Sequence, residues 1–523
     1  MLVISDIRKS LDADDGDAIE EALSRLGSRR SECERALIVR KGVDARRKNV
    51  NFVYSVGLFM RTDEQKAAKA IKGASVRSEF SLDIPKIRRA HDACRPVICG
   101  FGPAGMFAAL VLSRAGLHPV VIERGADADA RIETVRTYMR TGKLDINTNI
   151  QFGEGGAGTF SDGKLTTRIG SPVCEFVLKT FASHGAPEEI LYLARPHIGT
   201  DILTNVIKSI RREIISLGGE VRFLCRAEKI ITKNGRICGV FTEDGRTIET
   251  DTLILATGHS ARQMYEHIYE SGISIMPKPF SVGFRIEHLR KDIDEAMYGR
   301  FAEHKNLKSA EYQLSYREGD RGVYTFCMCP GGEVVAASSE EGAFAVNGMS
   351  RHARDGVNSN SAVVASVSAE DFGSGPLAGM YFQRRLEKSA YSLAQGRAPV
   401  STLGAYMGTG KNEFTRVLPS IRFKTCEADI SALFPKNIDG FLKRGLMAFE
   451  RKLAGFSSPD AVITGVETRT SAPVRIIRDD TRQSPDVKGL YPCGEGAGYA
   501  GGIMSAAVDG VNTAMQILKN LEG

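Results

Sequence analysis

The sequence predicts an α/β protein, and three neighbouring features indicate it. An apolar run over residues 96–99 leads into Gly100-Phe101-Gly102-Pro103-Ala104-Gly105, and an apolar pattern with helical spacing follows over 106–112. A second apolar run, 119–122, ends at Glu123, eighteen residues beyond Gly105. A G-x-G-x-x-G turn between a strand and a helix, with an acidic residue about 20 positions further on, is typical of a Rossmann-type dinucleotide-binding unit.

The residue types in this turn suit a bound dinucleotide. Gly100 permits the tight turn, Gly102 lets a pyrophosphate approach the backbone, and Gly105 lets the helix pack closely against the strand. The helix N-terminus offers free N–H groups and the positive end of its dipole to the phosphates. Glu123 can accept hydrogen bonds from ribose hydroxyls and would repel a ribose 2′-phosphate, which argues against NADP. The same cofactor is predicted to contact Pro103, Ala104 and Arg124.

Two later segments distinguish FAD from NAD. One is an apolar strand over 252–255 that runs into Ala256-Thr257-Gly258, and the other is 489–496, which contains Gly494 and Glu495. A helix-like run follows and begins near Gly502-Ile503-Met504. With the first glycine-rich turn, these segments resemble the three-part FAD signature of two-domain flavoproteins. The resemblance implies that Glu495, where most members have Asp, binds the ribityl chain; a helix-capping acid is the alternative.

A glycine-rich segment over 151–164 fits the same cofactor. Such a composition suits neither a helix nor a strand interior, so we expect a loop whose backbone amides approach a ligand. Phe152 and Phe160 flank the glycines and favour an anchored loop over a flexible one. In the flavoproteins that the chain resembles, the equivalent stretch runs beneath the isoalloxazine. The predicted cofactor contacts therefore include Gly158 and Thr159, and also Ala227 at the start of a later strand.

The resemblance extends over most of the chain. Further segments that carry it are 195–201, 326–332, 347–352 and 494–502. Together with the FAD signature, they resemble a family of FAD-dependent dehydrogenases from bacteria and plastids whose substrate is undefined. The resemblance implies a flavoprotein with noncovalent FAD and leaves the reaction open.

The pattern of expected elements divides the chain into three parts. Residues 1–90 read as a small α+β domain in the order β-α-β-β-α, which suggests a ferredoxin-like unit. Residues 91–275 and 455–523 are predicted to form the Rossmann-type FAD domain, with a meander and returning strand over 221–255. Residues 276–454 are expected to be an inserted mixed or antiparallel substrate domain, with strands at 281–287, 322–329 and 333–337. The sequence has no second G-x-G-x-x-G in a strand–helix frame, so a dedicated NAD(P)H domain is not expected.

Composition restricts the class of protein. No apolar run approaches 18 residues and no signal-peptide pattern opens the chain, so a cytoplasmic protein without a membrane partner is expected. The ten cysteines have no disulfide-framework spacing, which fits a reducing compartment. The net charge is +7, and Arg46-Arg47-Lys48 is the densest basic cluster. Acidic residues interleave the bases, which favours a solvated face over a nucleic-acid interface.

The candidates for catalysis are expected in the insertion and beside the glycine-rich loop. Arg351 and His352 could hold a carboxylate and donate a proton, although a surface turn explains them equally well. Lys164 follows the glycine-rich loop and could stabilise an anionic reduced flavin. Cys327 and Cys329 have no partnering pair at metal spacing, so no metal is expected.

These observations favour an FAD-dependent oxidoreductase that transfers hydride between a small organic substrate and FAD. The expected partners are an organic substrate, of which an anion is one candidate, and NAD(P)H or another electron donor that binds only transiently. A flavin monooxygenase or oxidase, an RNA-associated flavoprotein and a non-catalytic redox sensor are the alternatives.

Overall fold

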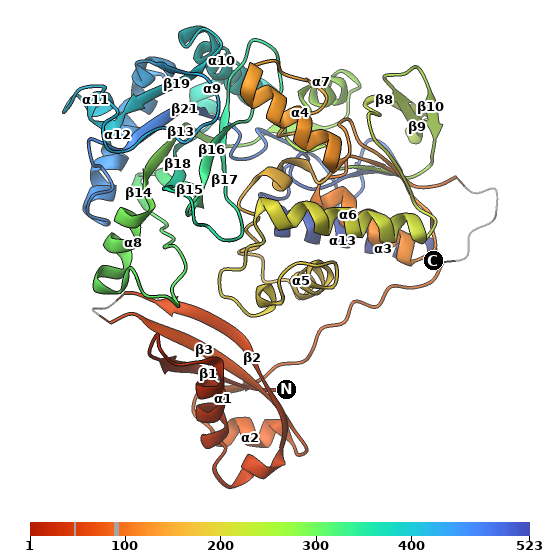
Figure 1. The fold of residues 1–523 in the computed structure, drawn as a ribbon. Helices are drawn as coiled ribbons and strands as arrows, with labels where there is room; N and C mark the ends of the chain where they lie inside the picture. Colours follow the sequence, from red (N-terminus) through yellow and green to blue (C-terminus); the bar gives the residue numbers. More distant parts are fainter. Residues whose placement is uncertain (47–48, 88–93, 523) are drawn as a thin grey trace.

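The computed structural model describes residues 1–46, 49–87 and 94–522 (Figure 1). Its first sheet is parallel throughout and consists, in spatial order, of β23 (Leu490–Pro492), β11 (Leu253–Leu255), β5 (Val97–Cys99), β6 (Val120–Ile122) and β7 (Glu220–Arg222). This sheet, with its helices, confirms the predicted α/β Rossmann-type fold class. The expectation that 221–223 belongs to the meander is wrong, because Val221 and Arg222 lie in the edge strand of the parallel sheet.

Successive residues of each parallel strand bury opposite faces, as strand geometry requires. Ile98, Val121 and Ile254 pack on one face against helices α3 (Pro103–Arg114), α5 (Val173–Ser183), α6 (Thr200–Ser216) and α13 (Ile503–Glu522). Their neighbours along the strands pack on the other face with α7 (Arg262–Glu270) and the meander β8 (Ala227–Lys233), β9 (Arg236–Thr242) and β10 (Thr247–Glu249). The single strand expected over 247–255 is therefore two strands, β10 and β11.

Helix α3 is buried on all sides because it lies between the sheet and α13. Gly105 lets α3 pack closely against the chain that leaves β5, since a Cβ at this position would overlap the carbonyl oxygen of Gly100. A Cβ on Gly510 of α13 would likewise overlap the Ala104 carbonyl. The two helices can therefore approach each other at backbone contact distance beneath the sheet.

The insertion is built on a seven-stranded sheet. Its order is β14 (Ser315–Glu318), β15 (Arg321–Cys329), β18 (Asn358–Val367), β13 (Phe280–Leu289), β21 (Val462–Glu467), β19 (Ala398–Thr402) and β20 (Thr425–Glu427). All neighbours are antiparallel except β19 and β20. Because β21 belongs to this sheet, the boundary that the sequence analysis set at 455 lies too early in the chain.

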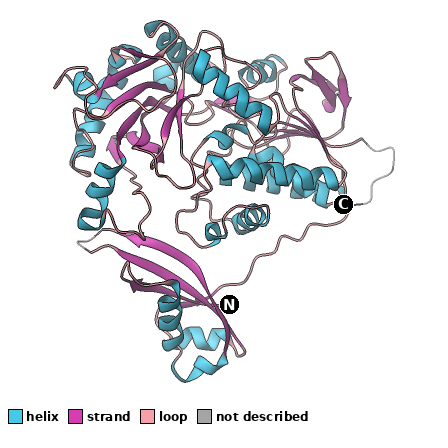
Figure 2. Ribbon diagram, in the orientation of Figure 1, coloured by secondary structure: helices cyan, strands magenta, loops and turns pink. Residues whose placement is uncertain are grey.

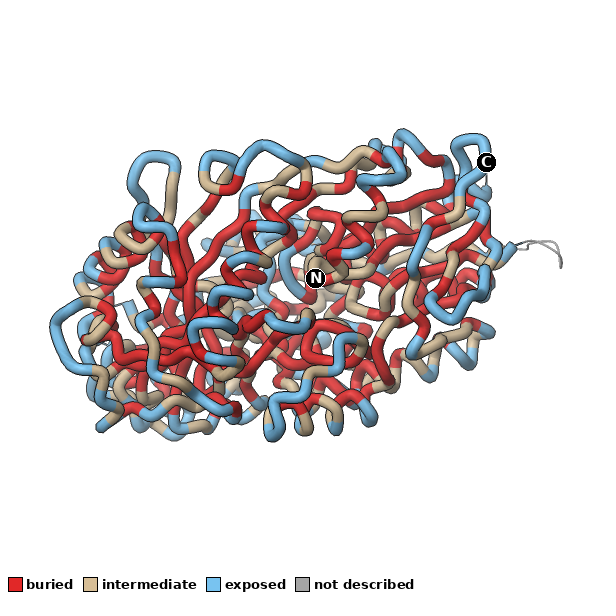
Figure 3. The backbone as a smooth tube through the Cα atoms, turned by 90° about the horizontal axis from the view of Figure 1, so that it is seen from above, coloured by how far each residue is buried: buried red, intermediate tan, exposed pale blue. Residues whose placement is uncertain are grey.

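Helices and smaller strands complete the insertion (Figure 2). The helices are α8 (Arg290–Tyr298), α9 (Ala369–Phe372), α10 (Ala378–Leu393), α11 (Leu403–Met407) and α12 (Lys436–Glu450). Strands β16 (Glu333–Ala336) and β17 (Val346–Met349) form a hairpin, and β12 (Ile275–Pro277) pairs with β22 (Val474–Ile476) where the chain enters and leaves the insertion. Viewed from above, buried residues lie in the interior and exposed residues gather on the outer loops (Figure 3).

The N-terminal unit has its own antiparallel sheet, in the order β2-β3-β1-β4, and lies apart from the two larger sheets in Figure 1. Its elements are β1 (Leu2–Lys9), α1 (Asp15–Ser24), β2 (Cys33–Asp44), β3 (Asn51–Met60), α2 (Glu64–Ala70) and β4 (Ala74–Val76). This β-α-β-β-α-β order is that of a ferredoxin-like unit. The expected boundary at 90/91, and Arg47 and Lys48 of the basic cluster, lie outside the described residues.

Specific contacts attach this unit to the rest of the molecule. The Lys41 N–H donates to the Tyr192 carbonyl, and the Ala194 N–H donates back to the Lys41 carbonyl, each at 2.8 Å. Beyond β4, the apolar side chains of Phe80, Leu82, Ile84 and Ile87 pack against the helical face of the parallel sheet. In the described residues, no helix combines the length and the apolar character needed to cross a bilayer.

Candidate functional site

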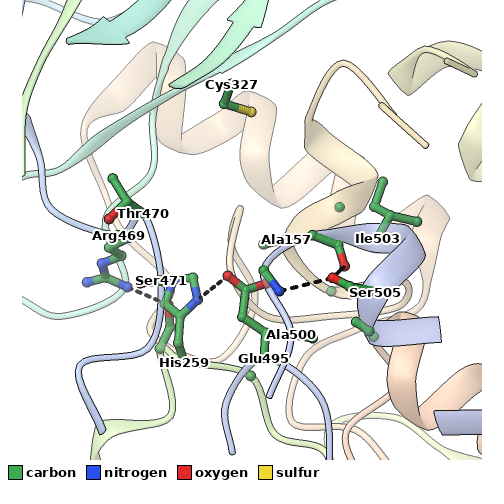
Figure 4. A pocket seen from close by; sticks show the side chains of 18 of the residues that line it. Ala157, His259, Cys327, Arg469, Thr470, Ser471, Glu495, Ala500, Ile503 and Ser505 are labelled. Atoms are coloured by element: carbon green, nitrogen blue, oxygen red, sulfur yellow. Dashed lines mark hydrogen bonds and ion pairs between the residues drawn. The ribbon is translucent and has the colours of Figure 1, made fainter. Parts of the chain in front are cut away.

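A cavity of about 1830 Å³ lies between the parallel sheet and the insertion. It extends from the Gly100–Ala104 turn to the wall made by β15 of the insertion, and Figure 4 shows part of its lining. A typical small-ligand pocket holds roughly 300–1,000 Å³. This cavity is therefore large enough for an extended dinucleotide together with a second molecule.

The phosphate end of the cavity is the N-terminus of α3. Gly102 caps this helix without a side chain, Pro103 is its first residue, and both line the cavity with Ala104. Gly100 has a φ of +101°, a conformation that favours glycine. A Cβ on Gly102 would meet its nearest neighbour, the Gly156 Cα, only at 3.8 Å, so the space beside Gly102 belongs to the cavity. The free N–H groups of this helix end suit a phosphate.

Glu123 joins the three backbone segments around the ribose end. Its buried carboxylate accepts hydrogen bonds from the Phe101 N–H at 2.8 Å and from the Gly125 and Gly153 N–H groups at 2.9 Å. Each carboxylate oxygen has more than one acceptor site, so ribose hydroxyls can still bind. Glu123 therefore shapes this part of the cavity as well as lining it.

Arg124 lies beside Glu123 and covers the ring of Phe152 at 4.3 Å. Its guanidinium donates to the side-chain oxygens of Asn147, at 2.8 Å, and Gln263, at 3.0 Å. Burial lowers the pKa of Arg124 to about 10, and the neighbouring Arg226 adds to this effect, yet the group stays charged at neutral pH. In the part of the chain that the structure describes, no carboxylate hydrogen-bonds to Arg124, so its positive charge suits a dinucleotide. Ala227 lines the same region.

The flavin end combines Ala256-Thr257-Gly258, Glu495 and the start of α13, all of which line the cavity. The Nδ1 of His259 lies 3.2 Å from the Glu495 Oε1. A dashed line marks this contact in Figure 4. The Nε2 of His259 is buried and has no hydrogen-bond partner among the described residues. Among the described residues, apart from the chain neighbours, nothing lies within 4 Å of a Cβ built on Gly501 or Gly502, which precede Ile503 and Met504. An unpartnered polar atom and an open glycine cradle fit a bound flavin at this end.

The glycine-rich loop is anchored by a residue that the sequence analysis did not single out. Arg131 of α4 (Ala128–Thr141) is fully buried, and its guanidinium donates to the carbonyl oxygens of Asn149, Ile150 and Glu154 at 2.6–2.9 Å. It also covers the Phe160 ring at 4.9 Å. The expected anchored loop is therefore held chiefly by Arg131.

Arg131→Met is expected to lower the free energy of unfolding by about 3 kcal/mol or more, because three buried carbonyls lose a charged donor and each costs at least about 1 kcal/mol. Flavin content should fall as well, since the loop lines the cavity. Urea unfolding and absorption spectra of the purified protein measure both effects. Arg136→Met is the matched control, because Arg136 lies on the same helix with its side chain 73% exposed. Equal stability of the two variants would contradict the anchoring role.

Three predicted cofactor residues do not line the cavity. Gly105 and Gly494 lie behind it: a Cβ on Gly494 would be 2.7 Å from the Ala104 Cβ, so both glycines allow close packing around α3. The Thr159 hydroxyl is buried and donates to the Glu154 carbonyl at 3.0 Å. These three residues were predicted to contact the cofactor. In the structure they lie behind the residues that line the cavity and support them.

Arg351 and His352 also lie outside the cavity. Arg351 is exposed, whereas the His352 ring stacks on His197 at 5.1 Å and its Nδ1 lies 3.0 Å from the Ile198 carbonyl oxygen. The prediction that these two residues hold a substrate above the flavin is therefore wrong. Local sequence could not reveal this, because β17 ends before them and directs the following turn toward α6.

Lys164, by contrast, lines the cavity. Its Nζ donates to the Met328 carbonyl and lies 3.3 Å from the Asp162 carboxylate. Burial opposes its charge, but Asp162 and Glu311 outweigh burial and raise the pKa of Lys164. An ammonium has three N–H donors, so one remains for a ligand.

The insertion supplies cavity residues that the sequence analysis missed. Arg285 of β13 is fully buried and donates to Glu467, to the Cys327 carbonyl and to the Asn347 side chain, at 2.7–3.2 Å. Glu467, Cys327 and Asn347 all line the cavity, so one guanidinium fixes this wall. A charged residue inside the apolar strand 280–289 is the sequence signal that could have found it. No group of three or more potential metal ligands occurs among the described residues.

The parallel sheet, the bare helix N-termini and the extended cavity define a dinucleotide-binding flavoprotein. Residues 279–470 match the family described as "FAD-dependent protein, C-terminal domain-like", and residues 1–59 match a domain of unknown function, DUF8436. An uncharacterized protein of Clostridium beijerinckii is 44% identical over an alignment of 529 positions that covers 99% of this chain and 99% of its own. The chain belongs to the family of this clostridial protein, and its cofactor is FAD.

Three solved structures are similar to this chain at lower sequence identity. CtdE in complex with FAD is 12% identical over 82% of this chain and 88% of its own, with a TM-score of 0.33. The flavin-dependent brominase Bmp2 is 13% identical over 82% of this chain and 80% of its own, with a TM-score of 0.36. A geranylgeranyl bacteriochlorophyll reductase-like protein of Thermoplasma acidophilum is 14% identical over 82% of this chain and 79% of its own, with a TM-score of 0.36.

Proposed function

We propose that this protein is an oxidoreductase that transfers hydride between an organic substrate and noncovalently bound FAD. The observation that supports this most is the continuity of the cavity from the α3 N-terminus to the wall of β15. The FAD site occupies the sheet side, which leaves the insertion side for a second molecule. When bound, FAD supplies the hydride chemistry, and the chain orients the substrate and sets the local charge.

Lys164 is the proposed substrate-binding cation. Its Asp162 partner keeps it charged, and its remaining N–H can bind an anionic group of the substrate. Arg285 acts indirectly: it holds Glu467 and Asn347 in fixed positions on the same wall. The expected substrate is therefore a small or medium organic molecule with an anionic or strongly polar group.

Anaerobic mixing of the FAD-loaded protein with a panel of organic acids, alcohols and amines tests this proposal. The flavin absorption band should bleach with at least one anionic donor, and Lys164→Met should raise the concentration needed for half-maximal bleaching by tenfold or more, since a charge-assisted hydrogen bond is worth about 1.5–3 kcal/mol. Arg168→Met is the control, because Arg168 lines the cavity but its side chain is exposed. No bleaching by any donor, or rapid peroxide release in air as the main reaction, would contradict hydride transfer of this kind.

NADH and NADPH are expected to reduce the flavin slowly and without saturation. The reason is that the sequence carries a single dinucleotide-binding turn, and FAD occupies it. Stopped-flow absorbance at increasing NAD(P)H concentration measures this. A fast reduction that saturates at micromolar cofactor would reveal a nicotinamide site and change the proposed electron donor.

A further inference from the structure

Two cysteines meet at an irregularity in β15, on the insertion side of the cavity. The register with β18 shifts between Phe326 and Cys329, so three steps along β15 oppose two along β18. Cys327 lies in this bulge with a φ of +46°, which is uncommon for a residue other than glycine. Such conformations gather at functional sites, because the surrounding structure must hold them in place.

Two cations hold this bulge from outside the strand. Arg285 donates to the carbonyl oxygen of Cys327 at 2.8 Å, and Lys164 donates to the carbonyl oxygen of Met328. The Cys327 side chain lines the cavity, and Figure 4 shows it across the pocket from Glu495 and Ser505. The strained residue therefore directs its sulfur to the space where FAD and a second molecule meet.

The second cysteine lies behind the first. Cys329 is fully buried, and its Sγ lies 3.3 Å from the carbonyl oxygen of Cys327. A hydrogen bond from the Cys329 thiol lowers the pKa of Cys327 against burial, and the charges of Arg285 and Lys164 add to this effect. The same hydrogen bond, together with burial, raises the pKa of Cys329. The pair thus consists of a cavity-lining cysteine whose thiolate form is favoured and a buried cysteine whose thiol form is favoured, an arrangement that suits thiol–disulfide chemistry.

We propose that Cys327 and Cys329 form a redox-active dithiol that exchanges two electrons with FAD across this cavity. In the oxidising direction, an S–S bond forms between the two sulfurs, the Cys329 thiol loses its proton, and the two electrons pass to FAD. FAD takes up these electrons with two protons, one from Cys329 and one from solvent. The reverse step breaks the S–S bond and returns both sulfurs to the reduced pair. This proposal needs bound FAD but not the hydride transfer proposed above.

The spacing of the two cysteines supports a disulfide that cycles. Residues two apart on a regular strand have Cα atoms about 6.6 Å apart, within the usual range of about 4.4–6.8 Å for disulfides, but Cys327 departs from regular strand geometry with its φ of +46°. A disulfide closed beside such a residue would add to a backbone conformation that is already strained, and strained disulfides are easily reduced. A structural crosslink would gain little here, because the strand already fixes both residues.

An anaerobic titration of the air-oxidised, FAD-loaded protein with dithionite measures how many electrons each chain accepts. The native protein should take up four electrons per chain before the flavin is fully reduced, two for FAD and two for the disulfide. Cys327→Ser and Cys329→Ser should each take up only two. Cys225→Ser should still take up four, because Cys225 lines the same cavity at the ribose end, away from this pair.

A measurement on the native protein alone tests the proposal even if the cysteine variants do not fold. Alkylation of the denatured, air-oxidised protein, followed by peptide mass analysis, should find Cys327 and Cys329 unmodified and their shared peptide lighter by two hydrogens. Prior reduction should make both cysteines reactive. A two-electron titration of the native protein, or full alkylation of both cysteines after oxidation, would overturn the dithiol and leave the proposed hydride transfer standing.

Discussion

Gly102→Val should yield a folded protein that contains no bound flavin. Gly102 has an extended backbone that valine can adopt, and a Cβ there meets no atom closer than 3.8 Å. The added methyl groups would instead fill the space beside the α3 N-terminus, where the pyrophosphate must approach the backbone. Absorption spectra and circular dichroism of the purified variant measure flavin content and fold.

Gly105→Val is the contrasting variant. A side chain at Gly105 would overlap the backbone carbonyl of Gly100, which cannot move without separating α3 from β5. This variant should therefore lose the fold as well as the flavin, whereas Gly102→Val loses only the flavin. A yellow, stable Gly102→Val protein would show that the cofactor's phosphates lie elsewhere.

Glu387→Gln is expected to lower the free energy of unfolding by about 3–5 kcal/mol, the usual cost of breaking a buried ion pair. Glu387 is fully buried on α10 and accepts hydrogen bonds from Arg262 at 2.7–2.9 Å and from Arg469 at 2.9–3.1 Å. Arg262 belongs to α7 beneath the parallel sheet, whereas Arg469 follows β21 of the insertion. One carboxylate thus joins the two sides of the cavity. Denaturant unfolding measures the loss, and Glu341→Gln, at an exposed neighbouring acid, is the control.

The same network predicts a pH dependence. Burial alone would raise the pKa of Glu387, but Arg262 and Arg469 outweigh burial and lower it below its ordinary value of 4.5. The ionised carboxylate therefore contributes its full stability above about pH 4.5 and loses it as the pH falls toward the lowered pKa. The difference in unfolding free energy between the native protein and Glu387→Gln should narrow below pH 4.5. A difference that stays constant down to pH 3 would contradict the ion pair.

The cofactor end of the site was predictable because its determinants are local. Gly100, Gly102 and Glu123 are fixed by one strand–turn–helix–strand unit, and Glu495 lies next to a strand of the same sheet. The two later segments meet that unit because parallel strands end at one edge of the sheet. Local pattern and spacing therefore predict the dinucleotide-binding turn, whereas the choice of FAD and the role of Glu495 rest on the resemblance to known flavoproteins.

The opposite wall was not predictable, since its contacts join distant parts of the chain. Arg285 and Glu467 are 182 residues apart, and Arg262 and Glu387 are 125 residues apart. Nothing in the sequence near either member of a pair indicates the other. Arg351 was predicted to bind a carboxylate because of its charge and its neighbours in the sequence. The path of the chain after β17 instead exposes it to solvent. The residues that form this wall follow from topology, which local periodicity does not determine.

Acid precipitation of the purified protein, with chromatography of the supernatant, tests the central claim most directly. Noncovalent FAD in this cavity predicts that the supernatant contains FAD at about one molecule per chain and that the protein pellet is colourless. A supernatant that contains FMN, NAD or no flavin would contradict the account, as would a pellet that keeps the colour.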